Sequence, residues 1–318
     1  MRLVYFGTPE FAASQLEAIL AAGYEVVSVV TMPDKPAGRG KKIQFSDVKR
    51  TALEHNLPLL QPEKLKDPDF LKALEACHAD LFVVVAFRML PAVVWKMPPL
   101  GTFNLHASLL PQYRGAAPIN HAIINGETET GLTTFFLNEE IDKGRVILQE
   151  KVAIRPDETA GELHDELMHL GNQLVVETIK KIESGDYQTV PQEELDDGTM
   201  LNDAPKIFKD FCYIQWDRDC QSIYNHIRGL SPYPAAHTKL QPEEGEPIEL
   251  KVFASEIELI QHVHPAGTVL TDGKSYLKVA ANDGFIHLTT LQQAGKKAMN
   301  IAEFLRGIRL ESPLKALI

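Results

Sequence analysis

The stretch Leu81-Phe82-Val83-Val84-Val85-Ala86 decides the fold of the first part of the chain. All of its residues are apolar, and no polar residue alternates with them. A strand with one solvated face alternates apolar and polar residues, whereas a strand covered on both faces, which is typical of parallel sheets, is apolar throughout. We therefore predict that this stretch is a central strand of a parallel sheet.

Short strands are also predicted on either side of this run, at Arg2–Phe6, Glu25–Val30 and Gly101–Leu105. Helical segments separate them, and this alternation predicts an α/β fold with a doubly wound, Rossmann-like parallel sheet. Ligands bind such sheets beyond the carboxyl ends of the strands, close to the switch in strand order. The loops after Phe6, Ala86 and Leu105 are therefore where a site is expected.

Two of these helices carry recognisable capping residues. We expect the first to be capped by Thr8, to begin with Pro9 and to stop at Gly23, because hydroxyl side chains cap helix starts and glycine ends helices. We expect the second to be capped by Ser46 and to run through His55.

The last third of the chain has a different pattern. After a long helical stretch at Thr159–Ile182, the acidic and glycine-containing stretch Glu183–Asp203 lacks helical periodicity. One helix follows at about Asp217–Ile227, and then short strands at Glu249–Phe253, Thr268–Leu270, Tyr276–Ala280 and Phe285–Thr290. We therefore predict three parts: a Rossmann-like domain at 1–184, a linker at 185–204, and a smaller OB-like β-barrel domain at 205–318.

Composition limits the classes of protein to consider. The formal net charge is −11 over 318 residues, and residues 205–318 hold 13 basic and 13 acidic side chains, so the excess acid lies in the first two thirds. A general nucleic-acid binder is not indicated, although a local basic patch can still bind RNA. No apolar run is long enough to span a bilayer, and the N-terminus does not resemble a signal peptide, so we expect a cytoplasmic protein without a membrane partner. The cysteines Cys77, Cys212 and Cys220 indicate neither a disulfide framework nor a metal site.

Polar residues with chemical potential follow the strand at Gly101–Leu105. In an extended chain, residues two apart point the same way, so Asn104 and His106 are expected to face one pocket. The amide can stabilise a developing oxyanion, and the imidazole can donate to it or move a proton near neutral pH. Asp142, after the strand-like run Leu132–Leu137, is the best candidate to orient the imidazole. This set indicates acyl-transfer chemistry.

The pattern Asn104-x-His106-x-Ser108-Leu109-Leu110-Pro111, with Asp142-x-Gly144 downstream, resembles the signature of the 10-formyltetrahydrofolate-dependent formyltransferases. Three further stretches are similar to the branch of that family whose acceptor is a charged tRNA: Phe6–Phe11, Pro33–Lys42 and Tyr113–Pro118. The C-terminal segments Arg228–Pro234 and Pro265–Val269 match it more loosely.

The resemblance implies an enzyme that transfers the formyl group of 10-formyltetrahydrofolate to the α-amino group of methionyl-initiator tRNA, for translation initiation. The catalytic residues would be Asn104, His106 and Asp142. The folate site would comprise Phe87, Arg88, Met89 and Leu90 together with Ser108, Leu109, Leu110 and Pro111. The acceptor end of the tRNA would contact Arg39, Lys41 and Lys42, and the barrel would hold the tRNA. No metal is implied, and a monomer is expected.

The sequence departs from the family pattern in the folate and tRNA regions. Arg88 stands where a glycine is usual, Ala107 where a proline is usual, and Gln112 where a basic residue is common. These departures leave the catalytic residues in place, and they affect the expected contacts to folate and tRNA.

Three other functions fit parts of the sequence. A dinucleotide-dependent oxidoreductase is disfavoured because Gly7-Thr8-Pro9-Glu10 lacks the G-x-G-x-x-G pattern. A folate enzyme with a small acceptor, such as a sugar nucleotide, a glycinamide or water, needs neither the Arg39–Lys42 loop nor a second domain. A non-enzymatic RNA-binding module does not explain Asn104, His106 and Asp142.

Overall fold

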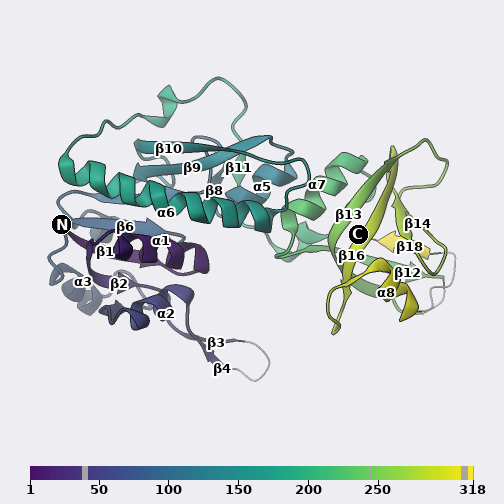
Figure 1. The fold of residues 1–318 in the computed structure, drawn as a ribbon, viewed down its shortest axis with the longest axis horizontal. Coiled ribbons are helices and arrows are strands. Elements are labelled where there is room, and N and C mark those ends of the chain that lie inside the picture. The colour runs from purple at the N-terminus through teal and green to yellow at the C-terminus, as the bar shows by residue number, and fades with distance from the viewer. Residues whose placement is uncertain (38–41, 244, 309–313, 318) are drawn as a thin grey trace. The chain divides into compact units, whose positions relative to one another are not determined.

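The structure is a computed structural model that describes residues 1–37, 42–243, 245–308 and 314–317 (Figure 1). It divides into two compact units, each built from segments that are separate in the sequence. The first unit comprises Met1–Gly115, Thr130–Val152 and His164–Asp203, and the second comprises Ala116–Glu129, Ala153–Leu163 and Ala204–Ile318. Two short segments from within the first 203 residues therefore belong to the second unit.

The first unit is built around one sheet with the strand order β10-β9-β7-β6-β1-β2-β5. Its strands are β1 (Arg2–Gly7), β2 (Glu25–Val30), β5 (Leu59–Leu60), β6 (Leu81–Val85), β7 (Thr102–His106), β9 (Glu129–Phe136) and β10 (Val146–Ala153). The five strands from β7 to β5 are parallel, with β6 in the middle of the sheet. β9 runs antiparallel to β7 and carries β10 on its outer edge. The predicted Rossmann-like sheet is confirmed, with an antiparallel extension at one edge.

Helices cover both faces of this sheet (Figure 1). They are α1 (Glu10–Ala21), α2 (Asp47–Glu54), α3 (Pro68–Glu75), α4 (Ala92–Trp95) and α6 (Ala160–Ser184), most of which belongs to this unit. Val4 and Phe6 of β1 pack with Phe70 and Val94, on the side of α3 and α4. Tyr5 points to the opposite side, where its hydroxyl donates to the Ala12 carbonyl of α1 at 2.6 Å. Alternate residues of one apolar strand thus enter two cores, which explains why the central strands are apolar throughout.

The predicted caps of the first two helices have different outcomes. Ser46 caps α2, because its hydroxyl accepts from the Lys49 backbone N–H at 3.1 Å. Thr8 does not cap α1, and this prediction was wrong. The extended residue before α1 is Pro9, so Thr8 lies one position too early to reach the free N–H groups of the first turn.

The second unit contains a small closed antiparallel barrel, as predicted. Its strands follow the order β13-β12-β18-β14-β15-β16, and pairing between β13 and β16 closes it. They are β12 (Ala236–Pro242), β13 (Ile248–Leu259), β14 (Thr268–Thr271), β15 (Leu277–Ala280), β16 (Gly284–Gln293) and β18 (Leu314–Leu317). Trp216 is buried in the core of this unit, where its indole N–H donates to the Thr238 hydroxyl at 3.0 Å.

Shorter elements complete the two units. They are the hairpin β3 (Lys35–Ala37) and β4 (Lys42–Gln44), the strands β8 (Arg114–Gly115), β11 (Asp203–Ala204) and β17 (Met299–Asn300), the helices α5 (Pro118–Ile124), α7 (Cys220–Leu230) and α8 (Ile301–Arg306), and the 3-10 helices η1 (Gln192–Glu194) and η2 (Lys209–Cys212). Among the described residues, no helix is both long enough and apolar enough to cross a membrane.

His226 of α7 should make the second unit less stable in acid. Burial, with a smaller contribution from nearby Arg218, lowers the pKa of this histidine from an ordinary value of 6.5 to about 4. The unfolded chain binds this proton at a higher pH than the folded chain does, so stability should fall as the pH drops from about 6.5 to about 4. A pKa difference of this size corresponds to roughly 3 kcal/mol of unfolding free energy.

The measurement is urea unfolding at several pH values, with Trp216 fluorescence as the signal in a Trp95→Phe background. His226→Gln should flatten the acid-side loss of stability, whereas His264→Gln, at an exposed histidine of the same unit, should leave it unchanged. An equally steep loss in the His226 variant would contradict the assignment.

Candidate active site

Strand β7 ends with the two residues expected to carry the chemistry. Asn104 pairs in register with Val84 of β6 on one side and with Phe135 of β9 on the other. Because alternate strand residues share a face, Asn104 and His106 lie on the same face at the carboxyl end of the sheet. Asn104 is half-buried and His106 is 6% exposed.

The structure assigns one proton on the His106 ring. Its Nε2 lies 2.9 Å from the backbone carbonyl oxygen of Tyr113. A carbonyl can only accept a hydrogen bond, so Nε2 must carry a proton and donate. The neutral ring then has its lone pair on Nδ1, and the protonated ring has a second N–H there. Nδ1 is therefore the nitrogen left for chemistry.

Asp142 lies in the loop between β9 and β10, with its backbone in the left-handed region at φ = 55°. Its Oδ2 accepts from the backbone N–H of Gly115 at 3.1 Å. Within the described part of the chain, no hydrogen bond or ion pair joins Asp142 directly to His106. The two are linked through the backbone of Tyr113–Gly115, which accepts from the histidine and donates to the aspartate.

The turn Ser108–Pro111 follows directly after His106, and it is fixed from inside the protein. The Ser108 hydroxyl is fully buried and donates to the Gln112 carbonyl at 2.6 Å. Thr133 of β9 donates to the Ser108 carbonyl at 2.6 Å and accepts from the Leu110 N–H at 3.1 Å. Gln149 of β10 donates to the Leu110 carbonyl at 2.8 Å. Ser108 and Leu110 therefore determine the shape of the turn, and Leu109 is its half-buried member.

The segment Phe87–Leu90 follows β6 at the same edge of the sheet. Phe87 packs edge-on against Phe6, with ring centroids 5.8 Å apart, and Leu90 is buried in the core. Met89 is 73% exposed, so its side chain is the one that this segment offers to solvent. Arg88 donates to the carbonyls of Pro62 and Glu63 and thereby ties the segment to the loop before α3. The arginine that replaces the usual glycine thus has a structural role.

Gln192 is a residue of this region that the sequence did not indicate. It lies in η1, within the stretch expected to be a linker, yet only 1% of it is exposed. Its side chain bonds to the loop that carries Asp142 and to Arg114. Nearby, Gln112 donates to the Met200 carbonyl at 3.1 Å and accepts from the Asn202 N–H at 2.9 Å. Single residues of the mostly exposed stretch 185–203 therefore bond to the rest of the first unit, to which this stretch belongs.

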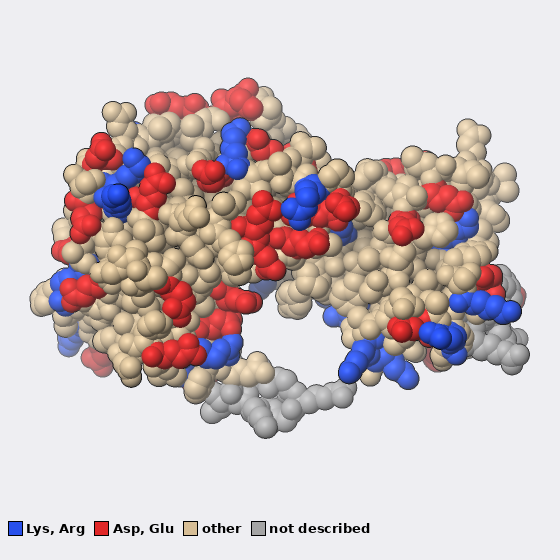
Figure 2. Space-filling model, in the orientation of Figure 1, with Lys and Arg blue, Asp and Glu red and all other residues tan. Residues whose placement is uncertain are grey.

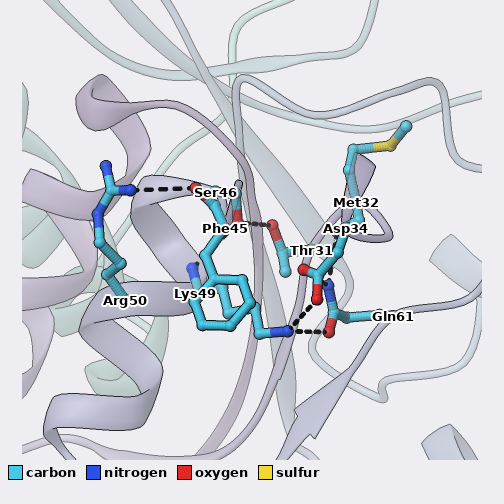
Figure 3. A network of polar contacts seen from close by, with 8 residues as sticks. All are labelled: Thr31, Met32, Asp34, Phe45, Ser46, Lys49, Arg50 and Gln61. Atoms are coloured by element: carbon cyan, nitrogen blue, oxygen red, sulfur yellow. Dashed lines mark hydrogen bonds and ion pairs between the residues drawn. The ribbon is translucent and has the colours of Figure 1, made fainter. Parts of the chain in front are cut away.

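Of the residues expected to contact tRNA, Arg39 and Lys41 lie outside the described residues. Lys42 begins β4, and its side chain is not described. The base of the β3–β4 hairpin is held by a polar network (Figure 3). Lys49 of α2 donates to Asp34 at 2.5 Å and to Gln61 at 2.9 Å, and Gln61 donates in turn to Asp34 at 2.9 Å. The hydrogen bond from Lys49 lowers the pKa of Asp34, which stays charged and neutralises that lysine.

A hollow of about 380 Å³ lies on the barrel of the second unit. It is lined by Tyr213, His237, Thr238, Glu249, Leu250, Lys251, Gln292, Ala294, Gly295 and Lys296. The Tyr213 and His237 rings meet edge-on at 5.5 Å, and Lys239 lies 5.8 Å over the Tyr213 ring. Burial lowers the pKa of His237, and Lys251 lowers it further. On the face drawn in Figure 2, acidic side chains are numerous over the first unit, and Lys and Arg gather along the lower edge of the second.

Two family models cover most of the chain. A formyl transferase model matches residues 1–179, and a formyl transferase C-terminal domain model matches residues 206–309. The methionyl-tRNA formyltransferase of Bacteroides fragilis is 55% identical over 315 residues, which are 99% of this chain and 97% of the relative. The chain belongs to the methionyl-tRNA formyltransferase family.

A second relative supports this assignment, and a solved structure shares the fold. The methionyl-tRNA formyltransferase of Bacteroides thetaiotaomicron is 56% identical over 99% of this chain and 98% of its own length. A sugar 3N-formyl transferase, crystallised in the presence of dTDP and 5-N-formyl-THF, has the same fold at 20% identity. Its TM-score is 0.65, with 93% of this chain and 99% of that chain covered. Among the described residues of the present chain, no group of three or more His, Cys, Asp or Glu is placed to hold a metal ion.

Proposed function

We propose that this chain transfers the formyl group of 10-formyltetrahydrofolate to the α-amino group of methionyl-initiator tRNA, giving N-formylmethionyl-tRNA. The observation that carries the proposal is the pair Asn104 and His106 at the carboxyl end of β7, in a member of this family. We also propose that the enzyme acts in the cytoplasm as a monomer and without a metal.

The first chemical step forms an oxyanion. The neutral amine of methionyl-tRNA attacks the formyl carbon of the donor, and the carbonyl oxygen takes up the negative charge of a tetrahedral intermediate. The Asn104 amide can donate to that oxygen, because it lies on the same face of β7 as His106 and is only half-buried. Protonated His106 can donate from Nδ1, because Nε2 is already engaged by the Tyr113 carbonyl.

The second step moves a proton and breaks a bond. The attacking nitrogen loses a proton, the folate nitrogen gains one, and the bond between the formyl carbon and that nitrogen breaks. Water can carry this proton from the attacking nitrogen to the folate nitrogen, while protonated His106 keeps its hydrogen bond from Nδ1 to the oxyanion. Asp142 supplies negative charge that favours the imidazolium. Its carboxylate accepts from the Gly115 N–H, and the nearby Tyr113 carbonyl in the same backbone segment accepts from the imidazole.

We assign folate binding to Phe87–Leu90 and Ser108–Pro111, which flank β7 at the edge where the reaction takes place. Arg39, Lys41 and Lys42 are assigned to phosphates near the acceptor end of the tRNA. The barrel domain, residues 205–318, is assigned to the tRNA body, because its hollow combines lysines with an aromatic ring. Residues 1–184 then carry the catalysis.

The Lys251 and Lys296 side chains provide a test of tRNA binding by the barrel. Replacing both with Ala should raise the KM for methionyl-tRNA by about tenfold at moderate salt, because two phosphate contacts and their released counterions are lost. The dependence of log(kcat/KM) on log[salt] should become shallower by roughly one to two. The KM for the formyl donor should stay the same.

The matched control is Lys66→Ala with Lys72→Ala, which removes two exposed lysines of the first unit. An equal rise in KM for the control pair would mean that only the total charge matters, and the hollow would then not be a tRNA site.

The choice of acceptor tests the proposed function itself. Enzyme with labelled donor is offered methionyl-initiator tRNA, an amino-sugar nucleotide, or glycinamide ribonucleotide. We expect kcat/KM for the charged tRNA to exceed the value for either small amine by at least about a thousandfold, since those amines bring none of the tRNA contacts. Comparable values for a small amine would favour a small-acceptor formyltransferase.

A further inference from the structure

The buried side chain of Gln192 makes hydrogen bonds in two directions. Its amide nitrogen donates to the backbone carbonyls of Asp142 at 2.8 Å and Gly144 at 2.9 Å. Its amide oxygen accepts from Nε and Nη2 of Arg114, at 3.0 and 2.6 Å. Both amide hydrogens and the oxygen are therefore in use, and one neutral group joins a loop to a strand.

Together with one further hydrogen bond, these contacts join the loop that carries Asp142 to the segment Arg114–Gly115 in two places. Gly115 follows Arg114, and its N–H donates to Oδ2 of Asp142. The loop has little conformational choice, because Asp142 has a positive φ and a Cβ on Gly144 would lie 1.6 Å from the Phe136 carbonyl oxygen. A left-handed conformation costs a non-glycine residue energy, and it persists where the surrounding structure holds it. Gln192 holds both ends of the Asp142–Gly144 loop.

We propose that Gln192 is a positioning residue for formyl transfer, which fixes the Asp142 carboxylate by tying the Asp142–Gly144 loop to Arg114–Gly115. The inference rests on the proposed function for its effect on turnover. Glu at this position keeps the acceptor for Arg114 and loses both donors to the carbonyls. Met fills a similar volume and loses every one of these bonds. A neutral amide is therefore required, because it must donate and accept at once.

The turnover experiment compares Gln192→Met and Gln192→Glu with Gln15→Met. Gln15 is a suitable control because it is also fully buried, and its amide bonds to Met168 and Asn172 of α6 instead. We expect both Gln192 variants to lose about 30-fold or more in kcat, with the KM values for donor and tRNA changing less than about threefold. Gln15→Met should lose comparable stability to urea and keep kcat within about twofold.

A double variant separates positioning from general destabilisation. If Gln192 acts through the Asp142 carboxylate, Gln192→Met should cost little further kcat in an Asp142→Asn background. A role in stability alone predicts the same fold-loss in both backgrounds, and that result would overturn the inference. So would a kcat of Gln192→Met or Gln192→Glu near the wild-type value.

A readout without turnover keeps this inference distinct from the proposed function. Hydrogen exchange at the Gly115 amide reports its bond to Asp142. It should speed up in Gln192→Met and remain slow in Gln15→Met. Unchanged exchange in Gln192→Met would overturn the inference. A wild-type enzyme that protects Gly115 and transfers no formyl group would instead show that the proposed function is wrong.

Discussion

His106→Ala is expected to lower kcat for formyl transfer to methionyl-tRNA by roughly a thousandfold. The variant loses the protonated donor to the oxyanion, and the loss of such a donor typically costs about a hundredfold to a thousandfold. The affinity for a folate analogue should change by less than about threefold, because Ser108 and Leu110 are held by Thr133 and Gln149 rather than by His106. Steady-state kinetics and equilibrium binding of the analogue give the two values.

Asn104→Ala provides the comparison for this prediction. It should cost about a hundredfold in kcat, and the double variant should lose less than the product of the single losses, because both groups act on one intermediate. A His106→Ala enzyme that retains near wild-type kcat would remove the imidazole from the mechanism. Multiplicative losses would place the two residues in separate steps.

Asp142→Ala is expected to lower kcat by about a hundredfold or more, and Asp142→Asn should reveal which property of the carboxylate matters. Asn tolerates the positive φ at this position and can still accept from the Gly115 N–H, so it removes the charge and keeps the geometry. If charge stabilises the imidazolium, Asn should be nearly as impaired as Ala. The measurement is kcat at saturating concentrations of both substrates.

The stability of the two variants supplies the control. Asp142→Ala should unfold at lower urea concentration than Asp142→Asn, since it loses the Gly115 bond as well. An Asp142→Asn enzyme with full kcat would mean that Asp142 holds the backbone and contributes no charge to the reaction.

The sequence was sufficient to predict the sheet, because a strand that is buried on both faces is apolar at every position. Leu81–Ala86 is apolar throughout, and β6 at Leu81–Val85 is the middle strand of the sheet. The antiparallel edge was not predicted, since a strand's direction depends on its partner. One signal was available: Leu137–Arg145, between β9 and β10, is shorter than the dozen or more residues that a parallel crossover needs.

The candidate site was predicted only in part, because it combines local and distant contacts. Asn104 and His106 are two apart on one strand, so their shared face follows from strand geometry alone. The bond from Gln192 to Asp142 spans 50 residues and starts in a polar stretch without periodicity. Tyr187 and Val190 interrupt that polar stretch, and Val190 pairs with Val146 at the start of β10. Apolar residues within an otherwise polar segment were the available indication that it packs on the sheet.

The hollow that we propose as a tRNA site is formed by residues that no single short motif contains. Tyr213, His237 and Lys251 come from different parts of the chain, and closure of the barrel brings them to one hollow. The even charge balance of residues 205–318 left RNA binding by this part of the chain open, but it did not indicate the hollow.

The transfer of label to one amine is the most direct test of the account. Excess enzyme with formyl-labelled 10-formyltetrahydrofolate is mixed with methionyl-initiator tRNA and quenched at intervals, and the product is digested to locate the label. We predict a single exponential that places the label on the methionine α-amine, with no transfer to the same tRNA carrying N-acetylmethionine. Label on the acetylated or uncharged tRNA, or no transfer to methionyl-tRNA, would contradict the proposed reaction.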